Sequence, residues 1–110
     1  MKNLLVLPLL VYSSILFSQK IYSTNSENQA NIKVFVVNSE NQADLNVYKV
    51  SSENQAGANN GKWFFVSSEN QAKKKIYFVK SENSAQLKVY FVKSESQAGW
   101  KNKSKQHLLY

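Results

Sequence analysis

The chain has 110 residues, with 14 lysines, no arginine and seven acids, which give a net charge of +7, and it contains no cysteine. This length is typical of one domain, and the lack of cysteine excludes disulfides, thiol nucleophiles and a lipid-modified cysteine at a mature N-terminus. Nucleic-acid recognition favours the bidentate contacts of arginine, so a charge made only of lysine does not indicate a nucleic-acid partner.

The first segment has the pattern of a secretory signal. Met1-Lys2-Asn3 is a short basic start, residues 4–17 are mostly apolar, and Ser18 is small. Such signals have a charged start, an apolar stretch of about 7–15 residues and a small residue at the cleavage site. We predict a signal peptide over residues 1–18, cleavage before Gln19 and export to the periplasm or the medium. A membrane anchor is the alternative, but a spanning helix needs about 20 apolar residues, so we expect no membrane span after cleavage.

The mature chain, residues 19–110, is expected to be a single repeat domain with 13 lysines and seven acids, a net charge of +6. Its repeated unit is the turn motif Ser-Glu-Asn-Gln-Ala or a near variant. Six copies begin at Ser26, Ser39, Ser52, Ser68, Ser81 and Ser94. The spacing is 13 residues except for one step of 16, where the Gly/Asn-rich segment 57–61 predicts a looser loop. A fixed period of this kind indicates one structural unit copied along the chain.

Short runs of β-branched and aromatic residues lie between the turns and predict strands. In chain order these runs are residues 20–24, 33–37, 46–50, 62–66, 75–79 and 88–92, followed by a degenerate seventh run that starts at Trp100. No apolar stripe with helical spacing runs through the unit, which disfavours helix. The mature chain also lacks proline, which suits continuous strand pairing because proline cannot donate a hydrogen bond to a sheet.

Equivalent positions of the repeat predict which side chains are buried. One strand position is always apolar and the next is always aromatic: Val34, Val47, Trp63, Ile76 and Val89, then Phe35, Tyr48, Phe64, Tyr77 and Tyr90. Successive strand residues point to opposite faces, so apolar side chains on both faces predict an all-β fold that is closed or two-layered. We expect the aromatic column to be core, the invariant alanine of each turn to occupy a tight site, and the lysine column to reach water. The alternative is a small β-solenoid with one coil per 13 residues.

These residues resemble the septoil-knot domain family, small bacterial repeat proteins of uncharacterised function. The family repeat has the form Lys-Val-Tyr-Phe-Val-x-Ser-Glu-x-Gln-Ala-x-Leu, and the segments 86–98, 44–48, 62–66 and 98–102 are similar to it. The likeness spans about residues 20–103, although the first repeat is more polar and the last is frayed. The resemblance implies a compact all-β domain of about seven strands whose backbone forms a torus knot with seven crossings.

No pattern of residues indicates catalysis or a cofactor. The turn glutamates are candidates for a calcium site, but calcium takes about six to eight oxygen ligands and each turn supplies only one acid. His107, the only histidine, lies in a polar tail, where we expect an exposed side chain rather than a general base. The serine of each turn is expected to hydrogen-bond the backbone rather than to act as a nucleophile.

We therefore expect a non-enzymatic exported domain with a structural or interaction role and without a cofactor. The alternative is a binding module for anionic or glycan material of the cell envelope, which would use Lys33, Lys75 and Lys88 with nearby aromatic residues. A metal-binding domain is a third hypothesis. The partner is left open between an envelope polymer and another protein, and the oligomeric state is left open as well.

Overall fold

The structure is a computed structural model that describes residues 18–110; the predicted signal peptide falls on residues outside this range, except for Ser18, and remains a prediction. Short strands alternate with 3-10 helices along the chain. The strands are β1 Lys20–Ser23, β2 Ile32–Val36, β3 Leu45–Lys49, β4 Lys62–Phe65, β5 Lys74–Phe78, β6 Leu87–Phe91 and β7 Gly99–Trp100. The helices are η1 Glu27–Gln29, η2 Glu40–Gln42, η3 Glu53–Gln55, η4 Glu69–Gln71, η5 Glu82–Ser84, η6 Glu95–Gln97 and η7 Lys103–Leu109. Within the described range, no helix has the length and apolar character needed to cross a bilayer.

Each copy of the turn motif folds as one 3-10 turn. In the first copy the Gln29 N–H donates to the Ser26 carbonyl oxygen and the Ala30 N–H donates to the Glu27 carbonyl oxygen, and the other five copies repeat both bonds. The predicted role of the serine side chain is wrong, because none of the six serine hydroxyls caps its helix. The serine backbone is extended and its carbonyl accepts the hydrogen bond instead.

Four strands begin one residue earlier than predicted. Three of them open with Ile32, Leu45 and Leu87, each at most 1% exposed. The prediction started these strands at the next residue, which is lysine or asparagine, whereas the residue before it already faces inward. Each of these strands therefore contributes two core residues, spaced two apart as the alternation of a strand requires.

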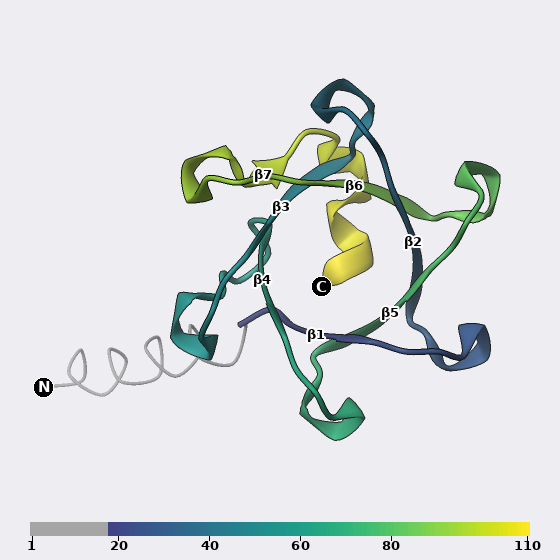
Figure 1. Cartoon of the computed structure of the whole chain (residues 1–110), viewed down its shortest axis with the longest axis vertical. Helices are drawn as coiled ribbons and strands as arrows, with labels where there is room; N and C mark the ends of the chain where they lie inside the picture. The colour runs from purple at the N-terminus through teal and green to yellow at the C-terminus, as the bar shows by residue number, and fades with distance from the viewer. Residues whose placement is uncertain (1–17) are drawn as a thin grey trace, which may run out of the picture.

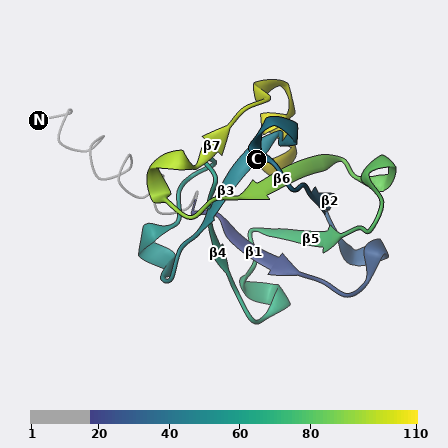
Figure 2. The same ribbon diagram turned by 45° about the horizontal axis from the view of Figure 1, so that its top comes forward.

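Six strands close into a ring in which all neighbours are parallel. The order is β4-β1-β5-β2-β6-β3, and β3 pairs with β4 to close the ring. Figure 1 shows this ring face-on with the turns projecting outward like the points of a star, and Figure 2 shows it inclined. The expected closed all-β structure with seven strands is confirmed. The β-solenoid alternative is wrong, because consecutive strands other than β3 and β4 are not neighbours in this ring.

The chain advances two places around the ring with each repeat. Strand β5 lies between β1 and β2, β6 lies between β2 and β3, and β1 lies between β4 and β5. The short β7 pairs antiparallel with the first half of β3 while β4 pairs with its second half, so β7 takes the place between β3 and β4. Seven strands placed two apart carry the chain twice around seven places, which is the winding of a torus knot with seven crossings.

The core fills the ring from the inside. Its fully buried residues are Ile21, Ile32, Val34, Leu45, Val47, Trp63, Ile76, Leu87, Val89 and Leu109. The predicted apolar column is therefore core. The aromatic column, predicted to be core, points to the outer face instead, and its members from Phe35 to Tyr90 are half-buried. Of the six turn alanines only Ala43 is buried, so the predicted tight site holds for one copy and the others are half-buried.

The segment 57–61 is a packed contact rather than the loose loop that its composition predicts. Asn59 is buried, and its two oxygens accept from Trp100 Nε1 at 2.9 and 3.1 Å. Helix η7 lies across the middle of the ring in Figure 1, with Leu109 fully buried. Gln19 Nε2 donates to the Leu109 carbonyl oxygen at 2.8 Å, so the two ends of the domain are tied together.

Replacing Gly61 by alanine tests the contact between β3 and the inserted segment. Gly61 has a φ of +89°, and a Cβ there would lie 2.4 Å from the Asn46 carbonyl oxygen. Gly99 is a matched control, because its φ is also positive, at +147°, but a Cβ there meets nothing within 4 Å. We expect Gly61→Ala to lower the free energy of unfolding in urea by roughly 1–3 kcal/mol more than Gly99→Ala. Equal losses would show that the clash with Asn46 does not matter.

Truncating Leu109 tests whether η7 closes one end of the ring. A buried leucine replaced by alanine loses about 2–5 kcal/mol of unfolding free energy. Leu108, the neighbouring residue, is only half-buried and serves as the control. Chemical denaturation should show a larger loss for Leu109→Ala than for Leu108→Ala, and the reverse order would contradict the packing of this helix.

Candidate functional site

Ion pairs connect the glutamates of the turns to lysines at the starts of five strands and to Lys101, which follows β7. All six glutamates take part, with N–O distances of 2.9–3.6 Å: Lys20–Glu53, Lys33–Glu27, Lys62–Glu95, Lys75–Glu69, Lys88–Glu82 and Lys101–Glu40. The paired side chains are 28–59% exposed, and ion pairs in such positions contribute only about 0–1 kcal/mol each. This belt of ion pairs therefore arranges charge on the outer face more than it stabilises the fold.

Half of the belt is local and half joins distant parts of the chain. Three glutamates pair with the lysine six residues later. Glu40 has asparagine rather than lysine six residues later, at Asn46. It pairs instead with Lys101 near the end of the domain. The three long-range pairs connect the start, the middle and the end of the domain across the outer surface.

The three lysines predicted to bind an anionic or glycan partner lie on neighbouring strands. Lys33, Lys75 and Lys88 belong to β2, β5 and β6, which are adjacent in the order β5-β2-β6. Each stands opposite an aromatic residue of the adjacent strand: Lys33 opposite Tyr77, Lys75 opposite Tyr22, and Lys88 opposite Phe35. The structure thus brings these lysines and aromatic side chains together on one outer face. Each ammonium group is held by a glutamate at 2.9–3.4 Å, so an anionic ligand has to compete with that carboxylate.

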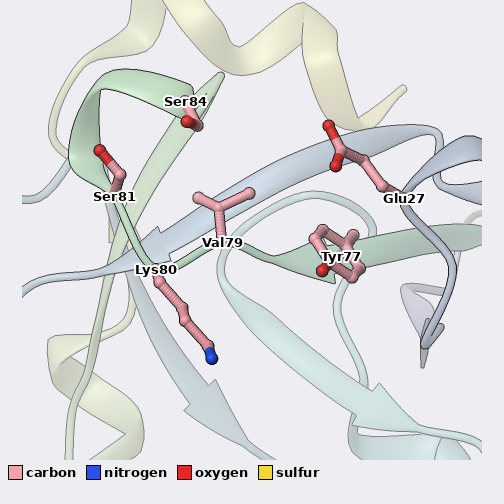
Figure 3. Close-up of a pocket in the computed structure, with 6 residues that line it drawn as sticks. All are labelled: Glu27, Tyr77, Val79, Lys80, Ser81 and Ser84. Carbon is pink, nitrogen blue, oxygen red and sulfur yellow. The ribbon is translucent and has the colours of Figure 1, made fainter.

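An open surface cleft of about 360 Å³ lies beside this face. It is lined by Glu27, Tyr77, Val79, Lys80, Ser81 and Ser84. In Figure 3 the Glu27 carboxylate and the Tyr77 ring lie on one side, the two serines of the η5 turn lie on the other, and the Lys80 ammonium points away from Glu27. Lys33 is connected to the cleft through its ion pair with Glu27. The lining combines an aromatic ring with carboxylate and hydroxyl groups, which are kinds of group that contact small polar ligands.

Five lysines that the sequence analysis did not single out make no ion pair with any carboxylate of residues 18–110. They are Lys49, Lys74, Lys80, Lys93 and Lys103. Lys49 Nζ lies 4.7 Å from the Phe91 ring centroid and 5.4 Å from that of Phe65. The local spacing did not single them out, because Lys20 and Lys62 also do not follow a glutamate by six residues and yet are paired across the ring.

The residues considered for catalysis or metal binding are not gathered into a site. His107 is exposed on η7, where its ring Nδ1 lies 3.0 Å from the Ser104 carbonyl oxygen, so the predicted polar tail is a helix. Over residues 18–110, no three His, Cys, Asp or Glu side chains are placed to hold a metal ion together. Asp44, which is buried, accepts from the Lys88 N–H and pairs with Lys105, and this organises the start of β3.

Comparison with known proteins agrees with the strand winding. A search of curated proteins finds no match to the chain. The 7(1) septoil knot domain matches residues 18–101, a range that includes all seven strands and all six repeated turns. The match carries no specific activity with it. By this match and by the order of its strands, the chain belongs to the septoil knot domain family.

Proposed function

We propose that this protein is exported and that its mature domain is a non-enzymatic structural or interaction module. The observation that carries the proposal is the distribution of charge. Each of the seven acidic side chains of residues 18–110 pairs with a lysine, while five further lysines have no carboxylate partner. A positive surface on a stable scaffold is suited to holding an anionic partner, whereas acid–base catalysis needs a donor and an acceptor that converge on a substrate.

The closed ring supports the same role. Strand edges that stay open invite pairing with other chains, and closing a sheet removes them. The ring leaves its turns and outer face free to carry contacts, because the core and the backbone hydrogen bonds are completed inside the domain. Such a scaffold can present side chains at constant positions without changing its own shape.

Binding of anionic or glycan envelope material is the second candidate, favoured by the three lysine–aromatic pairs and by the cleft. Exposed ion pairs such as Lys33–Glu27 contribute little, so a polyanion can replace the glutamate as the partner of the lysine. In the cleft, Tyr77 would offer its ring to a sugar while Ser81 and Ser84 offer hydroxyl groups.

Export is tested by expressing the full chain in a bacterial host and measuring the mature N-terminus. We expect a chain that begins at Gln19 in the periplasm or the medium, identified by intact mass and N-terminal sequencing. Ser18→Trp should block cleavage, since the peptidase needs a small residue there, and it leaves the mature sequence unchanged. Uncleaved chain in the membrane fraction of the unaltered protein would contradict export.

Retention on an immobilised anionic polysaccharide tests the second candidate. The mature domain should bind at low salt and elute as salt rises, because the screening length falls from about 10 Å at 0.1 M to about 3 Å at 1 M. Replacing Lys33, Lys75 and Lys88 by methionine should move elution to lower salt. The matched variant replaces Glu27, Glu69 and Glu82 by glutamine, which frees the same lysines and should delay elution. Unaltered protein that is never retained would rule out the second candidate and leave the first.

A further inference from the structure

The two ends of the ring are covered differently. All six ring strands are parallel, so all begin at one end and finish at the other. Helix η7 covers the end where the strands begin. Leu109 is buried there, Gln19 Nε2 donates to its carbonyl oxygen, and Lys105 pairs with Asp44 just before β3.

The opposite end, which we name the finishing end, presents the last residue of each ring strand. In ring order these residues are Ser23, Phe78, Val36, Phe91, Lys49 and Phe65. Each follows a fully buried core residue by two positions and so faces the same side of its strand. The three phenylalanines pack against the core and are partly buried, whereas Val36 is 41% exposed. This end therefore carries an apolar patch, made of Val36 and the three phenylalanines, that is partly exposed to solvent.

Lysines without acidic partners accompany this apolar surface. Lys49 is exposed, and its ammonium group lies over the rings of Phe65 and Phe91. Lys80 and Lys93 are also exposed and follow the last residues of β5 and β6 by two positions. The turn glutamates do not neutralise these three lysines, because each glutamate pairs with a lysine of the outer belt. The finishing end thus combines apolar side chains with unneutralised positive charge.

We propose that the finishing end docks on an anionic lipid surface. The proposal rests on the exported interaction role proposed above and names the partner. A bilayer supplies anionic headgroups directly above an apolar layer, which matches three lysines beside Val36 and the phenylalanines. Lys49 lies against two aromatic rings, so its charge is at the border between the apolar patch and water, where a lipid phosphate also lies.

Vesicle binding by the mature domain tests the charge contribution. Co-sedimentation should show binding to vesicles of phosphatidylcholine with phosphatidylglycerol and little binding to phosphatidylcholine alone. The variant Lys80→Gln/Lys93→Gln should weaken binding about 25-fold, taking about five-fold for each lysine near a charged surface. The matched variant Lys74→Gln/Lys103→Gln removes the same charge from the other end, since these lysines open β5 and η7, and should bind nearly as well as the unaltered protein.

A second pair of variants tests the apolar contribution. Val36 and Tyr110, at 41% and 69% exposure, are the exposed large hydrophobic residues of residues 18–110, and Tyr110 directly follows η7 at the opposite end. Val36→Ser should weaken vesicle binding and Tyr110→Ser should not. Circular dichroism of each variant shows whether it is folded before its binding is compared.

Several results would overturn the proposal. Equal weakening by the two double lysine variants would show that net charge alone attracts the protein to the vesicles. Absence of binding to phosphatidylglycerol vesicles, or equally strong binding to soluble polyphosphate, would refute a lipid surface as the partner. The proposed function is tested separately by retention on the anionic polysaccharide. If the mature domain is retained there but does not bind vesicles, the interaction role is supported and only lipid docking is refuted.

Discussion

Backbone pairing between repeats that are far apart in sequence is the interaction on which the whole structure depends. Each repeat returns the chain to the same end of the ring, because successive ring strands are parallel, and the connection leaves a gap one strand wide. That gap is filled only when the chain passes a second time, so that β5 enters between β1 and β2 and β6 enters between β2 and β3. Neither lap alone can satisfy its strand edges, so the ring is complete only when both laps are in place.

The irregular features of the sequence gather where the two laps meet. Asn46 breaks the lysine column, and its buried side chain donates to the Gln97 carbonyl oxygen. Gly61 lies against the backbone of Asn46, and the inserted segment holds the Trp100 indole through Asn59. The inserted segment thus contacts both the last strand, through Trp100, and η7, where Asn59 Nδ2 donates to the Gln106 carbonyl oxygen.

The same topology separates the surface into regions of different chemistry. The outer belt pairs the turn glutamates with lysines, and the end covered by η7 uses Asp44 and Lys105 in the same way. At the finishing end Lys49, Lys80 and Lys93 have no carboxylate partner among residues 18–110, and Lys49 lies against phenylalanine rings instead. Binding to an anionic partner is therefore best supported on surfaces where the ring leaves lysine unpaired, although the three lysines beside aromatic residues remain a second surface for it.

The sequence by itself determined the features that depend on local chemistry. These are an all-β domain, about seven strands, six turns at known places and an inward-facing apolar column from Val34 to Val89. Strand alternation and turn composition act over a few residues, so they can be read along the chain. The early start of strands such as β2, the half-buried aromatic column and the packed segment 57–61 were not predictable in this way, because they depend on what lies across the ring. Only the tertiary structure decided the parallel strand order, the covering of one end by η7 and which lysines lack a partner. Those outcomes depend on contacts such as that of Lys101 with Glu40, which the two laps bring together from distant parts of the sequence.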